Sequence, residues 1–353
     1  MKFPHKICFV FLCLLPYATQ ALRVQDLFTV EVPIADQSEA LRSKGVHSAF
    51  RLLLIKLTGD RQAAARASLS PLLIEAQRFV QQYSYREIVL EYEIDTGEII
   101  ESMETRLSVK FDQDNLNQAL RGLSQPLWGN ERPSTLVWLT VDDATGRSLV
   151  GLEEGPEYME AIARRAQQRG IPLLYPLLDL DDNAALRASD VWASFRQPVI
   201  DASARYFADA ILTGAIEFSA PGIWEARWTV YIGDQMATWT SESDLLEAVL
   251  DEGIDNLADI LASQFIDLAP TSVVTQVNLS VADVFSIDHY ADVLKYLSSL
   301  NSVVDVEVEQ LSPGQVTFTL SVHGGQSAVS QAIELGRVLE AISSHSGKYR
   351  RLP

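Results

Sequence analysis

Strand-like and helix-like hydrophobic patterns alternate along this chain in three successive blocks. In the first block, residues 22–125, LFTVEVPIAD alternates as a strand does, and helical spacing follows over residues 38–57, with Gly59 as a stop. SLSPLLIEAQRFVQQY predicts a second helix, YREIVLEYEI and TRLSVKFD predict paired strands, and QDNLNQALRGL predicts a third helix. The resulting order, β-α-α-β-β-α, is typical of a small mixed α/β domain.

The second block, residues 134–269, follows QPLWGNERPS, which has the composition of a linker. It opens with TLVWLTVDD, an apolar run typical of a strand buried on both faces. A helix is expected over residues 156–169, a short strand in IPLLYPLL, and helical structure over residues 185–208. DAILTGAIEF, a hairpin and a helix over residues 243–265 complete the block. Strands that directly follow helices favour a layered α/β sheet.

The third block, residues 270–345, has the order β-α-β-β-α, which predicts a ferredoxin-like domain. Its second helix is expected over SAVSQAIELGRVLEAI, where Gly336 lowers helix propensity unless it permits a close contact, so we predict a tight contact there. Residues 346–353 have no apolar pattern and are expected to be frayed. The fold class is thus α/β (α+β), with three small mixed domains in series.

The first 21 residues have the three parts of a secretory signal peptide. Lys2 and Lys6 give a positive start, residues 7–15 are apolar but too few to cross a bilayer, and Thr19 and Ala21 supply the small side chains of a cleavage site. The other interpretation is a buried N-terminal strand or helix. We expect cleavage after Ala21 and export to the periplasm. No later stretch approaches the ~20 apolar residues of a spanning helix, so direct membrane insertion is not expected.

Composition and missing motifs exclude several functions. Both cysteines, Cys8 and Cys13, lie in the predicted signal, so the exported chain would have no thiol for a disulfide, a nucleophile or a metal site. Cleavage would remove two lysines and no acid, which takes the net charge from −19 to −21 and disfavours nucleic acid and anionic lipid. No nucleophile elbow, phosphate loop or zinc-protease pattern occurs. We therefore expect no cofactor and favour a function other than catalysis.

Six segments occur in a characteristic order: VEVPIADQS, VQQYSY, PLLDLDD with DVW, RYFADAILTG, DVLKYLSSL and AIELGRVL. Together they resemble an uncharacterised bacterial exported family, domain of unknown function 2066 (DUF2066). The resemblance extends over nearly the whole exported chain and implies no established activity. The middle block is also similar to small α/β domains of outer-membrane assembly proteins, such as the N-terminal domain of the Tol translocation protein and the peptidoglycan-synthase activator lipoproteins.

The segment DLDDNAALRASD is the best candidate for a ligand site. Asp179, Asp181 and Asn183 occupy positions one, three and five of a calcium-type loop, and Asp190 occupies position twelve. Position six is Ala184, where such a loop requires glycine, and position twelve carries the shorter aspartate. The other interpretation is a polar strand-to-helix loop in which one carboxylate caps the next helix.

Three tryptophans form a second candidate site. Trp224 and Trp228 share one face of a predicted strand, and Trp239 lies on its hairpin partner. Such a row is either a platform for a partner or an apolar face packed on the closing helix. The stripe of Leu245, Leu246, Val249, Leu250, Ile254 and Leu257 favours packing.

These features favour a non-enzymatic periplasmic scaffold or adaptor that binds another protein of the cell envelope. The alternative is a carboxylate-based hydrolase centred on Asp179, Asp181 and Asp182, or a small-ligand or calcium binder that uses the Asp179–Asp190 loop. The two predict different structures. An enzyme requires these carboxylates to converge in a deep pocket beside Arg or His, whereas an adaptor does not.

Overall fold

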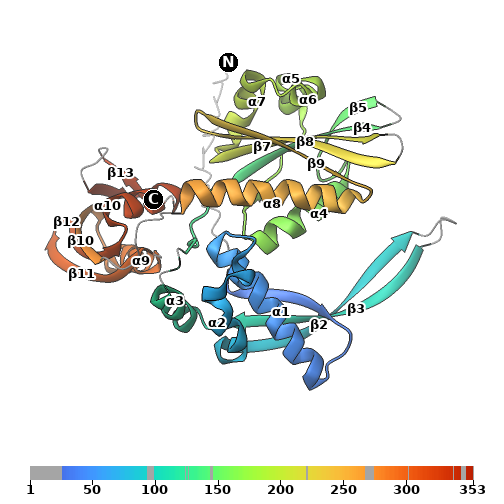
Figure 1. Ribbon diagram of the computed structural model, residues 1–353. Helices are drawn as coiled ribbons and strands as arrows, with labels where there is room; N and C mark the ends of the chain where they lie inside the picture. Colours follow the sequence, from blue (N-terminus) through green and yellow to red (C-terminus); the bar gives the residue numbers. More distant parts are fainter. Residues whose placement is uncertain are drawn as a thin grey trace, which may run out of the picture.

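The protein consists of three mixed α/β units in series, each built on its own sheet (Figure 1). The computed structural model describes residues 26–93, 99–123, 125, 127–143, 146–219, 222–266, 274–300, 302–336, 338–342 and 347–352. The predicted signal peptide therefore lies outside the described residues, and so does part of the predicted boundary near Pro270. Within the described residues, no helix is long and apolar enough to cross a membrane.

The first unit is a three-stranded antiparallel sheet covered by helices. Its elements are β1 (Thr29–Ile34), α1 (Glu39–Thr58), α2 (Ser70–Ile74), β2 (Val80–Glu93), β3 (Ile99–Phe111) and α3 (Gln113–Gly122), with the sheet order β1-β3-β2. Helix α1 begins where the Ser38 hydroxyl accepts a hydrogen bond from the Leu41 amide, and it ends at Gly59 in the left-handed conformation. Phe50 on α1 lies at a ring distance of 5.4 Å both from Phe79, just before β2, and from Phe111 on β3, and the second contact anchors the helix to the sheet.

The second predicted helix of this unit is shorter than expected. Residues 70–74 form α2, residues 76–79 form a 3-10 turn, and the chain then enters β2 at Val80. The segment VQQYSY, expected at the end of a helix, is therefore a strand. Its pairing with β3, which runs from Val80 opposite Phe111 outward, overrides a helical spacing that is only a local preference.

The central unit is a mixed sheet with helices on both faces. Its elements are β4 (Thr135–Asp143), β5 (Gly146–Val150), α4 (Pro156–Arg169), β6 (Leu173–Leu174), α5 (Leu180–Ala185), α6 (Ala188–Trp192), α7 (Arg196–Ser203), β7 (Ala210–Ser219), β8 (Ile223–Ile232), β9 (Gln235–Ser243) and α8 (Leu246–Phe265). The order is β5-β4-β7-β8-β9, with β6 also on β4. The expected long helix over 185–208 is divided into α6, α7 and a 3-10 turn.

The alternation of side chains along β4 explains the layers. Val137 and Leu139 face α4 and α8, whereas Leu136 and Trp138 face α6 and α7. Both sets are fully buried, as the apolar run predicted. Figure 1 shows α4 and α8 on one side of this sheet and α5, α6 and α7 on the other.

The third unit is ferredoxin-like. Its elements are β10 (Val274–Val284), α9 (Ile287–Ser299), β11 (Val303–Ser312), β12 (Gly314–His323), α10 (Gly325–Gly336), β13 (Leu339–Ala341) and β14 (Lys348–Arg351). Strands β10 and β11 are both antiparallel to β12, which lies between them, so β10-α9-β11 is a split β-α-β arrangement.

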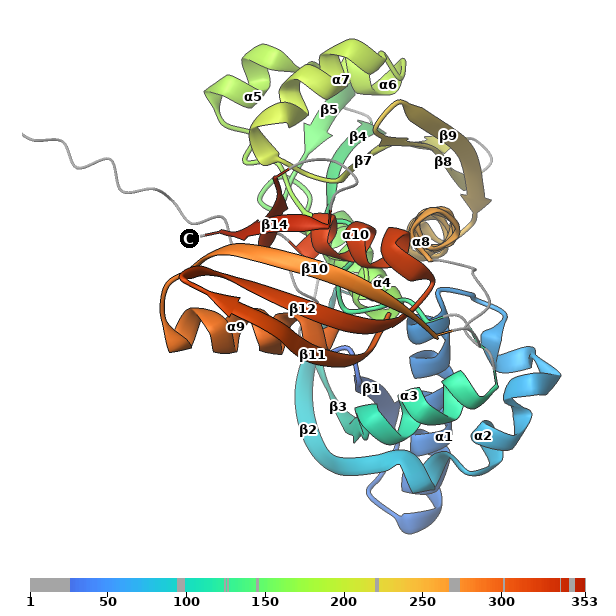
Figure 2. The same ribbon diagram turned by 90° about the vertical axis from the view of Figure 1, so that its left-hand side faces the viewer.

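The predicted frayed tail is wrong. Residues 348–351 form β14, which inserts between β10, to which it is parallel, and β13 (Figure 2). Tyr349 on this strand is buried in the core, and its hydroxyl lies 2.9 Å from Ser330 Oγ. Leu339, expected on the second helix, lies on β13 instead. One buried aromatic residue and a strand on each side are enough to order so short a segment.

Gly336 lies at the tight contact that its position predicted. It is the last residue of α10, and a Cβ there would lie 2.0 Å from Tyr296 Oη on α9. The absence of a side chain therefore allows α10 to approach α9, and the Tyr296 hydroxyl donates to the Ala332 carbonyl at 3.3 Å.

Candidate functional site

The candidate calcium loop is mostly helical. Asp179 is the N-cap of α5, and its Oδ1 accepts a hydrogen bond from the Asp182 amide at 3.0 Å. Asp181 and Asn183 lie within this helix, and Asp190 lies in α6, where its Oδ2 accepts from the Arg187 amide. The capping interpretation of the sequence therefore describes Asp179, because a carboxylate there satisfies a free amide and opposes the helix dipole.

Two carboxylates of this segment, those of Asp179 and Asp182, are bonded to Arg205 and Tyr206 and do not line a pocket. Arg205 donates to both oxygens of Asp179, at 2.9 and 3.0 Å, and to Asp182 at 3.2 Å. Tyr206 donates to Asp182 Oδ2 at 2.5 Å. Hydrogen bonds from Arg205 lower the pKa of Asp179, and burial, helped by the bond to Asp182, raises the pKa of Tyr206 to about 12. RYFADAILTG thus ties α5 to the chain entering β7.

This arrangement does not fit the two ligand hypotheses for the segment. The oxygens of Asp179 and Asp182 are directed to Arg205, Tyr206 and backbone amides. Among the residues that the structure describes, no three His, Cys, Asp or Glu side chains are grouped to hold a metal ion. Asp181 is exposed, so the three carboxylates of the hydrolase hypothesis do not converge in a deep pocket.

The tryptophan row belongs to the packed interior. Trp228 is fully buried against Gly253 of α8, where an added Cβ would lie 2.3 Å from the indole ring, and its Nε1 donates to Ser241 at 3.0 Å. Trp239 lies opposite Trp228 in the register and packs on the same core. Trp224 is partly buried against Phe218, with ring centroids 4.8 Å apart. Trp228 is therefore not available to a partner, and the packing interpretation accounts for the row.

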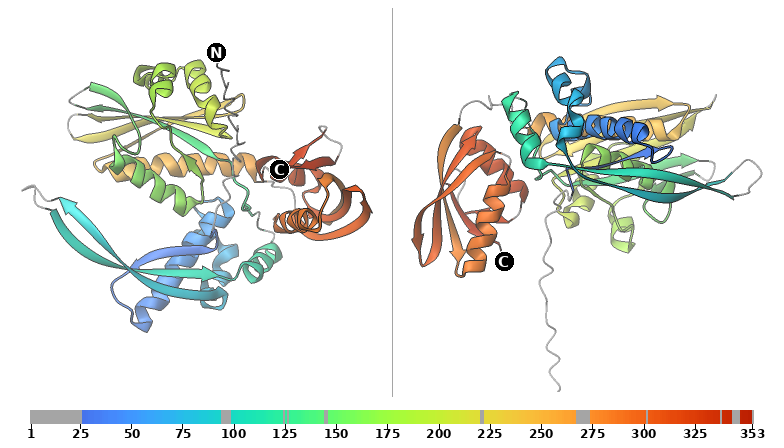
Figure 3. Two further views of the ribbon diagram at one scale, coloured as in Figure 1. Left: turned by 180° about the vertical axis from the view of Figure 1, so that it is seen from behind. Right: turned by 90° about the horizontal axis from the view of Figure 1, so that it is seen from below.

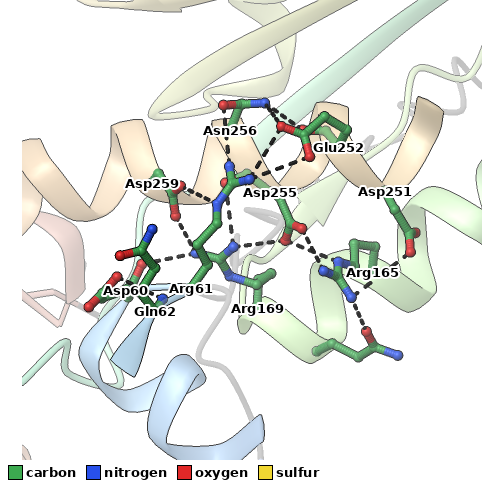
Figure 4. A network of polar contacts seen from close by, with 12 residues as sticks. Asp60, Arg61, Gln62, Arg165, Arg169, Asp251, Glu252, Asp255, Asn256 and Asp259 are labelled. Carbon is green, nitrogen blue, oxygen red and sulfur yellow. Dashed lines mark hydrogen bonds and ion pairs between the residues drawn. The ribbon is translucent and has the colours of Figure 1, made fainter. Parts of the chain in front are cut away.

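The first and central units are joined by a network of ion pairs (Figure 4). Arg169 at the end of α4 is buried and donates to Asp255 at 2.7 Å, to Asp259 at 2.6 Å and to the Gly59 carbonyl at 2.9 Å. Arg61, from the first unit, reaches the same Asp259 at 2.6 Å. Asp255 also accepts hydrogen bonds from Arg165. Burial alone would raise the pKa of the Asp255 carboxyl, but the bonds from Arg165 and Arg169 hold this pKa below its usual value.

Arg132 is a second junction, and it has no carboxylate partner among its hydrogen bonds. Its guanidinium donates to five carbonyls, those of Lys56, Trp128, Gly129, Arg169 and Gly170. Helices α1 and α4 both end beside this guanidinium group, and a buried cation is stabilised by the negative ends of their dipoles. The segment QPLWGNERPS is therefore a packed joint rather than a loose linker, since Trp128 is also buried in the central core.

The outer halves of β2 and β3 form a two-stranded arm. Strand β1 pairs with β3 only over Thr105–Lys110, whereas β2 and β3 pair with each other as far as Glu93 opposite Ile99. Over Ile99–Glu104 of β3 and Ile88–Glu93 of β2, each strand therefore pairs only with the other among the described residues, which leaves both outer edges unpaired there. Figure 3 shows the arm projecting away from the helices and the other sheets.

The arm combines exposed apolar side chains with negative charge. Val89 is 56% exposed and Met103 is 69% exposed, although they lie opposite each other in the register. Residues 87–104 contain seven Asp and Glu and no Lys or Arg. An acidic ribbon with free edges and apolar side chains in solvent is a surface that can take up another strand.

Sequence reasoning missed the arm and both junctions. The two strands were predicted as YREIVLEYEI and TRLSVKFD, so the prediction did not include the outer half of β3 before Thr105. A signal for the arm was available: EIVLEYEI and EIIESMET both mix apolar and acidic residues and contain no Gly or Pro. The junctions carry no such signal, because Arg132 and Arg169 bind groups up to 110 residues away in the chain.

Comparison with known families gives a match over the first unit. The model of a family described as a domain of unknown function (DUF8605) matches residues 21–129. The expected resemblance to DUF2066 is therefore wrong. Segments of six to ten residues with common strand and helix patterns were too short to distinguish one such family from another.

The other comparisons provide no functional assignment. No curated protein matches the chain. Among solved structures, the N-terminal domain of Protein Y from Thermus thermophilus is similar to 37% of this chain over 94% of its own length, at 8% identity and a TM-score of 0.18. A TM-score this low supports no conclusion about fold or function.

Proposed function

We propose that this protein is an exported, periplasmic adaptor that binds a protein partner of the cell envelope through the β2–β3 arm. The observation that carries the proposal is the arm's geometry: two long strands that leave the sheet and keep both outer edges free. An isolated two-stranded ribbon is marginally stable in water. Its retention is explained if a partner strand completes it.

The composition of the arm favours a basic partner. Seven acidic residues over 87–104, without a compensating base, attract a segment rich in Lys or Arg and repel acidic ones. Addition of a strand would supply main-chain hydrogen bonds, and the exposed side chains of Val89 and Met103 would supply apolar contacts. The proposed partner is therefore an extended, basic segment of another protein.

Site-specific photo-crosslinking in cells tests this function. A photoreactive residue replaces Val89 or Met103 on the arm, and in a matched control it replaces Leu152, which is 56% exposed on the central unit. We expect one crosslinked product at the two arm positions and none at Leu152. The double substitution Glu91→Lys and Glu101→Lys should abolish that product, since it reverses part of the arm's charge.

An arm-deleted variant supplies the second control. Ile88 and Glu104 lie directly opposite each other, so Asn-Gly in place of residues 89–103 closes the hairpin with a two-residue turn. This variant lacks both crosslinking positions, so it is tested by co-purification: it should fold and no longer retain the protein that was crosslinked at the arm. A product that forms equally at Leu152, or one that persists after charge reversal, contradicts the proposal.

The compartment is tested separately. The positive, apolar and small-residue segments of the first 21 residues support export. We expect the protein recovered from fractionated cells to lie in the periplasmic fraction and to begin at Leu22 by mass spectrometry. An intact Met1 terminus in the cytoplasmic fraction would contradict the proposed location.

A further inference from the structure

A cleft of about 540 Å³ lies between the first unit and α4 of the central unit. Its walls come from β1, α1, the C-terminal half of α4 and the chain that follows, and they include Val30, Leu52, Ile171 and Leu173 as apolar surface. A volume of this size is typical of small-molecule sites. The cleft is separate from the β2–β3 arm surface that carries the proposed function.

Lys56 is the unusual group in this cleft. The residue is only 5% exposed, and among the described residues only Asp26 offers it a favourable charge, without a hydrogen bond to its ammonium group. Its backbone carbonyl is held by Arg132 at 2.6 Å, and its stem packs against Gly170. A buried lysine without a hydrogen-bond partner is costly, so its presence requires a reason.

Burial, together with the charge of the nearby Arg132, lowers the pKa of the Lys56 ammonium to about 8, and Asp26 offsets part of this shift. The charge is therefore retained at neutral pH in an environment that disfavours it. An anion that entered the cleft would relieve this cost by supplying the missing acceptor.

Tyr175 provides a second unpaired donor in the same cleft. Its hydroxyl is buried without a hydrogen-bond partner, and burial raises its pKa to about 12, so it stays protonated and able to donate. The charged residues that line the cleft are three cations, Lys56, Arg106 and Arg164, and two acids, Asp26 and Glu31. The cleft thus has a positive balance on a chain whose net charge is −19.

The walls are fixed before any ligand arrives. Arg169 and Arg61 hold the first unit to α8 through Asp259, and Arg132 ties the end of α1 to the end of α4. A preformed cleft lowers the entropic cost of binding.

We propose that this cleft binds a small aliphatic monocarboxylate, with its carboxylate on the Lys56 ammonium, its chain against the apolar wall, and the Tyr175 hydroxyl as a further donor. Two observations favour a carboxylate over a phosphate. Arg106 and Arg164 already donate to Glu104 and Glu247, so no free guanidinium fork is offered. The C-terminal halves of α1 and α4 line the cleft, and their dipoles disfavour a doubly charged group.

Isothermal titration calorimetry of the full chain with octanoate tests the proposal. We expect saturable binding at one site, weaker binding of octyl phosphate, and little or none of the neutral 1-octanol. Lys56→Met should weaken octanoate binding by about 10- to 100-fold, and Tyr175→Phe by about 3- to 10-fold, because charged and neutral hydrogen bonds differ in strength. Lys295→Met, on the exposed face of α9, is the matched control and should leave binding unchanged.

The pH dependence tests the role of Lys56 without a substitution. Only the protonated ammonium attracts the carboxylate, so affinity should fall about fourfold between about pH 6.5 and about pH 8.5 for a free-state pKa of about 8. The other charged groups facing this site are the carboxylates of Asp26 and Glu31 and the guanidinium groups of Arg106, Arg132 and Arg164. Burial and the charge of Arg169 lower the pKa of Arg132 to about 9, which still lies above this pH range.

Two outcomes would overturn the proposal. One is the absence of saturable octanoate binding to the parent protein. The other is binding that Lys56→Met does not change, provided that its melting temperature shows a folded protein. If that variant does not fold, the parent's pH profile and Tyr175→Phe decide: a flat profile with an unchanged affinity contradicts the site.

Discussion

Single residues set the closest contacts in this molecule, and Gly336 provides the sharpest test. An added Cβ would lie 2.0 Å from Tyr296 Oη and 2.8 Å from its Cζ. We predict that Gly336→Ala destabilises the third unit by about 1–3 kcal/mol through overpacking, despite the better helix propensity of alanine. Hydrogen exchange of α9 and α10 in the full chain measures the loss.

A matched substitution separates packing from propensity. Gly122 is also the last residue of its helix, and a Cβ there would meet nothing within 4 Å. Gly122→Ala should therefore be neutral or slightly stabilising. Tyr296→Phe should restore part of the stability that Gly336→Ala removes, because it deletes the nearest atom. Equal effects at Gly336 and Gly122 would mean that the contact with Tyr296 is not the cause.

At the scale of elements, those defined by interactions between neighbouring residues were predicted, and those defined by contacts with distant segments were not. Helices α1 and α4 were predicted closely because local backbone chemistry sets their ends: Ser38 begins α1, and Gly59 and Gly170 end α1 and α4. The start of β2 and the strand β14 were missed because only their pairing with distant strands defines them. Lys56 likewise reads as an ordinary helical lysine, and its burial is visible only after α4 packs across it.

Strand β14 yields a prediction of its own. Deletion of residues 347–353 removes Tyr349 from the core and leaves one edge of β10 unpaired. We expect the third unit to lose about 2–3 kcal/mol from the lost aromatic burial, with more from the lost pairing, and the amides of β10 to exchange faster. Tyr349→Phe, which removes only the contact with Ser330, should cost about 1 kcal/mol. Unchanged exchange in β10 after the deletion would restore the expectation of a frayed tail.

At the scale of the whole molecule, the first two units meet at a buried cation, because Arg169 of the central unit donates to the Gly59 carbonyl of the first unit. Asp255 is 6% exposed and accepts from both Arg165 and Arg169, so its loss leaves Arg169 without one of its two carboxylates. We predict that Asp255→Asn lowers the free energy of unfolding at neutral pH by about 1.5–3 kcal/mol, the usual worth of hydrogen bonds to a charged group. Asp255 is 90 residues from Arg165 and 86 residues from Arg169 in the chain, so these ion pairs could not be predicted from local patterns.

The pH dependence of that loss has a defined sign. The arginine bonds outweigh burial and hold the pKa of Asp255 below its ordinary value of 3.8. The stability that Asp255 contributes is therefore fully present above pH 3.8 and is lost as the pH falls toward the lower, folded-state pKa. The difference between the parent protein and Asp255→Asn should therefore be constant from about pH 7 to about pH 5 and should shrink below about pH 3.8, because a protonated aspartate resembles asparagine in charge. Urea unfolding of both proteins at several pH values measures it. A difference that stays the same through the acid range would place the defect in packing, and the interface would then owe its stability to shape rather than to charge.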